Sequence, residues 1–303
     1  MQHKRLSITW LLLLGLLGAC AAPPPQLVRS DYCQSGDILL DAHFDAANLG
    51  ECQVLADGSF QLTLFPEDDP PINRSPWFAF RVSGEASDSV TVRMKFRHGY
   101  PRYWPKTSPD RLNWQPLPET RVTIGKGASE GDDEWMEFSL QLDQAQTWVA
   151  GQEILAGKYY ADWTLELEQH AELSTRLIGN SEQGRPIYLA HNADRPELVL
   201  MIGRQHPPEV TGAIAMRSFI RAVLADTELA RDFRQRYQVA IVPLVNPDGV
   251  AAGHWRHNVN GADTNRDWGP FTQPETRAVH QWLLAREQQG RKLQLMLDFH
   301  STF

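Results

Sequence analysis

The chain has 303 residues, of which 42% are hydrophobic and 22% charged, a composition typical of a folded protein with room for two domains. Its formal net charge is -8. This charge argues against nucleic-acid binding, which requires a basic surface to displace counterions from phosphates.

The chain begins like an exported protein. Lys4 and Arg5 precede an apolar run at residues 8–19. The run has the length of a secretory signal and is short for a permanent membrane helix, which needs about 20 residues. We therefore expect residues 1–19 to be a signal peptide.

The end of this run, Leu17-Gly18-Ala19-Cys20, resembles a bacterial lipobox, in which the cysteine is acylated. We expect Cys20 to carry a lipid and residues 20–34, with three consecutive prolines, to form a stiff tether. The predicted location is a bacterial membrane, facing the periplasm or the cell exterior. An ordinary signal peptide with Cys20 there by chance is the alternative.

Two further cysteines, Cys33 and Cys52, follow the tether. In an oxidising compartment such a pair tends to form a disulfide. They could equally be two small buried hydrophobic residues, and the sequence leaves both interpretations open.

Short runs with period-two apolar patterning fill residues 35–168, separated by Gly, Pro, Asp and Asn. This pattern is typical of antiparallel β structure, and we expect an N-terminal antiparallel β-sandwich domain. We expect the aromatic side chains of this domain to pack inside it, and the alternative is that they form a carbohydrate- or peptide-binding face. Strands are expected at Ser59–Phe65, Trp77–Val82, Val90–Phe96, Trp135–Leu142 and Trp163–Leu167.

Residues 169–303 follow a different pattern. A strand pair at Leu177–Asn192 is followed by apolar strands that alternate with helices. This order indicates an α/β domain with a mixed, largely parallel sheet and buried strands. The expected strands are Glu197–Gly203, Tyr237–Leu244 and Leu293–Phe299, and the expected helices are Glu209–Ala225 and Pro274–Gln288.

Three potential metal ligands, His206, Glu209 and His300, follow the ends of two of these strands. Functional sites in such sheets lie at the carboxyl ends of strands, and two imidazoles with a carboxylate suit zinc. Metal-bound histidines give their second N–H to a carboxylate or carbonyl. Asp263 and Asp298 are the candidates for that role.

Five sequence blocks follow one another in the second half of the chain. They are HPPE at 206–209, NPDG at 246–249, WRHN at 255–258, GADTNRDW at 261–268 and DFHS at 298–301. In order and spacing these blocks resemble the zinc carboxypeptidases of the carboxypeptidase A type, and the β-rich front half is most similar to the cytosolic-carboxypeptidase branch and its bacterial relatives.

The resemblance implies one zinc ion, held by His206, Glu209 and His300, with Asp263 orienting His206. It also implies hydrolysis of C-terminal peptide bonds in peptides or proteins by metal-activated water.

The resemblance also assigns the substrate contacts. Arg256 would polarise the scissile carbonyl and stabilise its oxyanion. Asn265 and Arg266 would bind the C-terminal carboxylate of the substrate.

The general-base glutamate and the usual tyrosine of this family come after the third ligand, and no residue up to Phe303 matches them. We therefore expect a C-terminally truncated domain whose 303-residue form is inactive or incomplete. Two alternatives stay open: a zinc-dependent deacylase of small N-acyl amino acids, and a non-catalytic lipoprotein that binds cell-envelope material.

Overall fold

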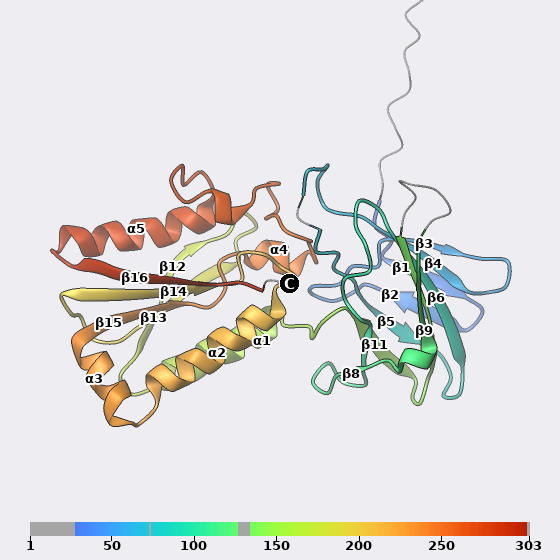
Figure 1. Ribbon diagram of the computed structural model, residues 1–303, viewed down its shortest axis with the longest axis horizontal. Coiled ribbons are helices and arrows are strands. Elements are labelled where there is room, and N and C mark those ends of the chain that lie inside the picture. The colour runs from blue at the N-terminus through green and yellow to red at the C-terminus, as the bar shows by residue number, and fades with distance from the viewer. Residues whose placement is uncertain (1–27, 73, 127–133, 302–303) are drawn as a thin grey trace, which may run out of the picture.

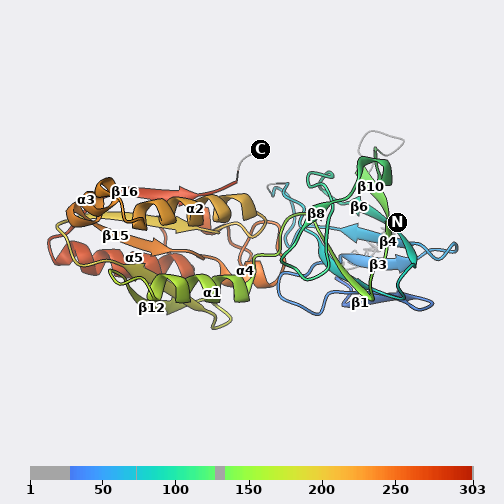
Figure 2. The ribbon, with the colours of Figure 1, turned by 90° about the horizontal axis from the view of Figure 1, so that it is seen from below.

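The computed structural model describes residues 28–72, 74–126 and 134–301, which form two domains at opposite ends of the long axis (Figures 1 and 2). The expected signal peptide, Cys20 and Phe303 lie outside the described residues. We call the part that contains β1 to β11 the front domain and the part that contains α1 to β16 the α/β domain.

The front domain contains two sheets, with strand orders β1-β2-β5-β11-β7-β8 and β3-β4-β6-β10-β9. The elements are β1 (Tyr32–Ser35), β2 (Ile38–Asp41), β3 (Glu51–Val54), β4 (Phe60–Leu64), β5 (Ala79–Ser83), β6 (Ser89–Phe96), β7 (Lys106–Ser108), β8 (Gln115–Pro116), the 3-10 turn η1 (Glu119–Arg121), β9 (Val122–Gly125), β10 (Glu134–Gln141) and β11 (Gln146–Ala150).

Alternating burial along the strands builds one shared core. In β6 every second side chain is buried, as expected for a strand with one face against a core. Phe80 of the six-stranded sheet and Val92 and Phe138 of the five-stranded sheet belong to the same hydrophobic cluster. A disulfide between Cys33 and Cys52 joins β1 of one sheet to β3 of the other, which resolves the alternative left open by the sequence.

The front domain departs from a purely antiparallel arrangement. β4 and β6 pair in parallel, with Leu62 opposite Met94, so the expectation of antiparallel pairing throughout is wrong for this sheet. The chain leaves β4 and crosses to the other sheet through β5 before it returns as β6, and this connection permits the parallel pairing. Trp77 and Phe78 are buried, as expected for core aromatics.

The strand expected at Trp163–Leu167 is wrong, because these residues lie in helix α1 (Gly157–Glu168). Its buried residues Tyr160, Trp163 and Leu167 are spaced three and four apart, which is the helical repeat. They pack in the core of the α/β domain, so α1 belongs to that domain although it precedes the boundary expected at residue 168. The five residues WTLEL at 163–167, taken alone, fit both the two-residue repeat of a strand and the repeat of a helix.

The sheet of the α/β domain has the order β12-β13-β15-β14-β16. β14 pairs in parallel with β15 and β16, whereas β13 is antiparallel to β12 and β15, so the sheet is mixed but not largely parallel. The elements are β12 (Ser174–Asn180), β13 (Pro186–His191), β14 (Glu197–Gly203), α2 (Val210–Leu224), α3 (Glu228–Arg236), β15 (Tyr237–Val242), α4 (Pro247–Ala251), the 3-10 turn η2 (Thr264–Arg266), α5 (Pro274–Gln288) and β16 (Lys292–Phe299).

Helices cover both faces of this sheet, with α1 and α2 on one side and α5 on the other (Figure 1). Along β14, Val199 and Met201 face the first helix layer, and Leu198, Leu200 and Ile202 face the second. Burial on both faces explains why this strand is apolar at successive positions.

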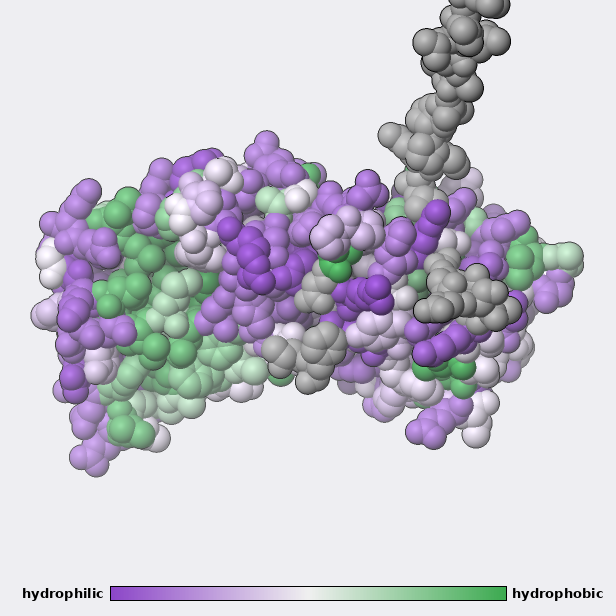
Figure 3. Space-filling model, turned by 45° about the horizontal axis from the view of Figure 1, so that its top comes forward, coloured by the Kyte–Doolittle hydropathy of each residue, from purple (hydrophilic) through white to green (hydrophobic). Residues whose placement is uncertain are grey.

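β16 is less buried than its sequence predicts. It lies at the edge of the sheet, and Leu295 is 46% exposed. The expectation of a buried strand is therefore wrong for β16, because among the described residues it has a strand neighbour on one side only. Hydrophobic surface is visible over this domain in Figure 3. Among the described residues, no helix is both long and apolar enough to cross a membrane.

Candidate metal centre

The three predicted ligands, His206, Glu209 and His300, lie at one corner of the α/β domain, which we call the metal corner. His206 follows β14 by three residues, Glu209 directly precedes α2, and His300 directly follows β16. Because β14 and β16 are parallel neighbours in register up to Gly203 and Phe299, their carboxyl ends meet. The strand order therefore brings together residues that are 94 positions apart in the chain.

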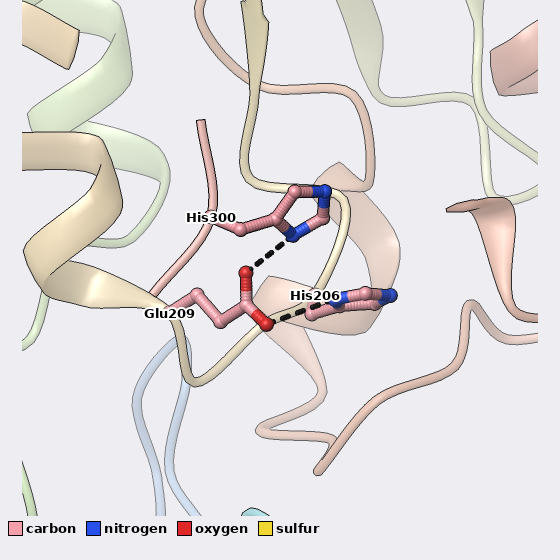
Figure 4. A group of neighbouring side chains, drawn as sticks. All are labelled: His206, Glu209 and His300. Carbon is pink, nitrogen blue, oxygen red and sulfur yellow. Dashed lines mark hydrogen bonds and ion pairs between the residues drawn. The ribbon is translucent and has the colours of Figure 1, made fainter. Parts of the chain in front are cut away.

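The carboxylate of Glu209 lies between the two imidazole rings (Figure 4). Its Oε1 is 2.9 Å from Nδ1 of His206, and its Oε2 is 2.6 Å from Nδ1 of His300. The candidate ligand atoms all lie within 4.8 Å of one another. His206 is 3% exposed and Glu209 6%, so the corner is largely shielded from water.

In both histidines the nitrogen that points away from Glu209 forms a hydrogen bond with a carboxylate, as is usual for metal-binding histidines. Nε2 of His206 is 3.0 Å from Oδ1 of Asp263, and Nε2 of His300 is 2.7 Å from Oδ2 of Asp298. Each ring thus turns its Nδ1 toward Glu209 and its Nε2 toward a supporting carboxylate. Two nitrogens and one carboxylate form the ligand set of a catalytic zinc site that keeps a position for water, so these residues fit a zinc ion.

The electrostatics of the corner favour a cation. Burial alone would raise the pKa of Glu209, but hydrogen bonds from His206 and His300 outweigh it and lower that pKa to about 2. Burial alone would lower the pKa of His300, but Asp298 and Glu209 raise it to about 10. The negative charge of the carboxylates therefore attracts protons to the rings, and a metal ion would displace those protons on binding.

Two residues that the sequence analysis missed support this corner. Gln205 donates from Nε2 to Oδ2 of Asp298 at 2.6 Å and accepts from Nε1 of Trp268 at 2.8 Å. The buried Arg204 donates from Nε to the carbonyl of Pro207 at 2.8 Å, which holds the turn that carries His206. Their position directly before HPPE was the only signal available.

The first turn of α2 packs closely against the third ligand. A Cβ on Gly212 would lie 2.7 Å from the carbonyl carbon of His300, so only glycine fits here. Ser301 donates its backbone N–H to Oε2 of Glu209 at 3.1 Å. Close backbone packing thus ties the strand that carries His300 to the helix that follows Glu209.

Arg256 lies beside the candidate ligands. Its Nε donates to Oδ2 of Asp263 at 2.8 Å, while Oδ1 of the same carboxylate faces His206. Burial alone would raise the pKa of Asp263, but His206 and Arg256 lower it well below its usual range. One carboxylate therefore connects a predicted ligand with the predicted carbonyl-polarising arginine.

Asn265 and Arg266 occupy the 3-10 turn η2 that follows Asp263. Nδ2 of Asn265 is 3.2 Å from Nε2 of His300. Arg266 is exposed, and its Nη1 donates to the carbonyl of Asn265 at 3.3 Å. The structure thus brings Asn265 to the metal corner and leaves the guanidinium of Arg266 on the adjacent surface.

Two family models match the chain. The model described as zinc carboxypeptidase matches residues 160–302, and the model described as the cytosolic carboxypeptidase N-terminal domain matches residues 40–151. Their limits agree with the structure, since the first includes most of α1 and the second ends within one residue of β11.

Curated relatives match over both domains. Cytosolic carboxypeptidase 6 of Mus musculus is 24% identical over 299 residues, which cover 88% of this chain and 54% of the mouse protein. The protein of the same name from Homo sapiens is 24% identical over 310 residues, covering 91% of this chain and 60% of the human protein. The chain thus spans little more than half the length of these relatives.

Solved structures share the fold. The metallo-carboxypeptidase from Burkholderia cenocepacia matches with a TM-score of 0.71 and 21% identity, over 88% of this chain and 70% of that one. The metallo-carboxypeptidase from Pseudomonas aeruginosa matches with a TM-score of 0.66 and 23% identity, over 87% of this chain and 69% of that one. The chain thus joins two domains: residues 40–151 match the cytosolic carboxypeptidase N-terminal domain, and residues 160–302 belong to the zinc carboxypeptidase family.

Proposed function

We propose that the protein is a zinc-dependent carboxypeptidase that removes the C-terminal residue of peptides or proteins. The observation that carries this proposal is the convergence of His206, Glu209 and His300, with ligand atoms within 4.8 Å of one another. These three residues would hold one zinc ion, which supplies Lewis-acid activation of water for hydrolysis.

Arg256 would stabilise the negative charge that develops on the carbonyl oxygen. Asp263 accepts from its Nε and so fixes the plane of the guanidinium. Among the described residues, neither terminal nitrogen of Arg256 has a hydrogen-bond partner, which leaves both free to donate to a substrate oxygen.

Asn265 and Arg266 would bind the C-terminal carboxylate of the substrate. A guanidinium and an amide on consecutive residues can donate to the two oxygens of one carboxylate. Asn265 contacts His300 and Arg266 is exposed, so the pair extends from the metal corner outward. This geometry would select the free end of a peptide.

The general base is assigned to none of the described residues. The two sheets of the front domain we interpret as a β-sandwich, supported by their shared core. Export and lipid attachment at Cys20 stay proposals that rest on the sequence of residues 1–20 alone.

A metal assay and a paired peptide panel test the proposal. Protein expressed from its gene should bind one zinc per chain and hydrolyse peptides with a free C-terminus, but not the same peptides with a C-terminal amide. Equal hydrolysis of both peptide sets would contradict carboxypeptidase activity, and cleavage confined to small N-acyl amino acids would favour a deacylase.

A further inference from the structure

Arg256 lies on an irregular segment, residues 251–257, that we call the arginine segment. It begins at the last residue of α4, and Arg256 itself lies outside every helix and strand. Irregular backbone does not satisfy its own hydrogen bonds, so its conformation depends on external partners. For this segment the partners come mainly from the front domain.

The front domain binds three successive carbonyls of the arginine segment. Each carbonyl accepts from a different donor, at 2.8 to 3.0 Å. The pairs are the backbone N–H of Ala46 with Ala251, Nη1 of Arg29 with Ala252, and Nδ2 of Asn48 with Gly253.

Gly253 allows this contact to be close. Its φ is +60°, and a Cβ there would lie 2.5 Å from the carbonyl oxygen of Ala47. Any other residue would therefore push the segment away from the front domain.

Glu67 holds the last three residues of the arginine segment, 255–257. It lies just after β4, and its carboxylate accepts three consecutive backbone N–H groups: Trp255 at 2.6 Å, Arg256 at 2.7 Å and His257 at 2.5 Å. Hydrogen bonds to an ionised acceptor are stronger than neutral ones. One front-domain side chain thus fixes the backbone at the residue that carries the guanidinium.

The side chains on either side of Arg256 are also held by the front domain. Trp255 is fully buried within the hydrophobic core of the front domain. Nδ1 of His257 forms a hydrogen bond with Asp68. Rotation of the segment about Arg256 is therefore restricted on both sides.

Glu67, Asp68 and His257 also have the composition of a metal site, with candidate atoms within 4.8 Å of one another. The hydrogen bonds argue against that use. Both oxygens of Glu67 already face N–H donors, whose positive ends would repel a cation. The carboxylate is arranged to bind amides.

We propose that Glu67 is a positioning residue for Arg256, so that the front domain forms part of the catalytic machinery. The proposal rests on the function proposed above for Arg256. Glu67 fixes the backbone of Arg256 from the front domain, and Asp263 fixes its side chain from the metal corner. Displacement of a catalytic group by about 1 Å can cost a hundredfold in rate, so removal of either anchor should weaken transition-state binding.

The test uses Glu67→Gln, which keeps the size of the side chain but turns an amide nitrogen toward an N–H donor. Asp110→Asn is the matched control, because Asp110 is a front-domain carboxylate that accepts the backbone N–H groups of Leu112 and Asn113 far from this segment in sequence. The first readout is amide hydrogen exchange at Trp255, Arg256 and His257. We expect exchange there to rise about tenfold or more in Glu67→Gln and to stay unchanged in the control.

The second readout is a double-mutant cycle with Arg256→Ala. The probe is a peptide phosphonate with a free carboxylate, which imitates the tetrahedral state of peptide hydrolysis and binds more tightly than a substrate. Glu67→Gln should weaken its binding to zinc-loaded protein about tenfold when Arg256 is present, and less than about twofold in the Arg256→Ala background. If Glu67→Gln does not fold, Glu67→Asp enters the same cycle.

Unchanged hydrogen exchange, or an equal loss of affinity in both backgrounds, would overturn the positioning role. Failure of the unaltered protein to bind the phosphonate would instead count against the proposed function, and the exchange experiment would still report on the contact made by Glu67.

Discussion

The metal corner and the arginine segment are adjacent, and both contact Asp263, yet the protein holds them in different ways. His206, Glu209 and His300 follow the ends of β14 and β16, and their supports Asp263, Asp298 and Gln205 come from the α/β domain. The arginine segment lies outside the sheet and takes most of its partners from the front domain.

This difference separates the residues proposed for two roles. The proposed metal ligands lie in the α/β domain, whereas the position of Arg256, the arginine proposed to polarise the carbonyl, depends on contact between the domains. Metal binding and transition-state stabilisation should therefore respond to different substitutions.

The largest effect is expected at the ligands. In protein expressed from its gene, His206→Ala should abolish zinc binding and lower kcat by more than about a thousandfold, since the metal would supply several kcal/mol of transition-state stabilisation. Zinc analysis and peptide hydrolysis measure both effects. His43→Ala, whose side chain is 61% exposed in the front domain, is the control and should change neither.

Arg256→Ala tests the arginine segment, the second of the two regions compared. Loss of one oxyanion donor should lower kcat by about a hundred- to a thousandfold, with one zinc per chain retained. Steady-state kinetics and metal content together separate the two effects. Loss of zinc in this variant would show that the arginine segment and the metal corner are not independent.

Asp263→Asn should affect both regions, because Asp263 contacts His206 and Arg256. We expect zinc affinity to fall about 10- to 100-fold, as for other residues that support a metal ligand, together with a lower kcat. Competition with a zinc chelator measures the affinity. Asp298→Asn is the comparison, which should weaken zinc binding with a smaller effect on kcat at saturating zinc.

The smallest effect on chemistry is expected at Asp267, four residues further along the same motif. Its carboxylate accepts from the backbone N–H groups of Thr272 and Gln273 at 2.9 and 2.8 Å and from the hydroxyls of Thr272 and Thr276, at the start of α5. Asp267→Asn should lower the free energy of unfolding by about 1–3 kcal/mol and leave zinc content unchanged.

The pH dependence of this effect has a defined sign. Burial alone would raise the pKa of Asp267, but the hydrogen bonds from Thr276, Gln273 and Thr272 outweigh it and lower that pKa. A depressed pKa in the folded state adds stability above the unfolded value of about 3.9, and this stability is lost as the pH falls toward the folded pKa. Urea unfolding measures the free energy of unfolding of the unaltered protein and of Asp267→Asn. The difference between these two free energies should be constant at neutral pH and should narrow below about pH 4.

Several elements and the ligand cluster of the α/β domain could be predicted from the sequence, whereas the residues that join the two domains could not. β14 and α5 match their predicted limits, and the convergence of His206, Glu209 and His300 follows from the rule that parallel strands end at one edge. α1 was missed because five residues of its sequence also alternate with period two. The exposure of β16 was missed because apolar residues alone do not reveal an edge position.

Glu67 could not be predicted from the sequence. It lies 189 positions before Arg256 and belongs to no recognisable motif. Its contact with the arginine segment forms only when the front domain packs against that segment, and tertiary contacts such as the burial of Trp255 accompany this packing. The roles of the three ligands, Arg256, Asn265 and Arg266 stay predictions that biochemical experiments must test.

The most direct test of the metal centre is zinc analysis combined with X-ray absorption at the zinc edge, on the unaltered protein and on His206→Ala, Glu209→Ala and His300→Ala. We predict one zinc per chain, coordinated by nitrogen and oxygen only, and loss of that zinc in each variant. An unaltered protein without zinc, sulfur in the coordination, or full zinc retention in any of the three variants would contradict the assignment.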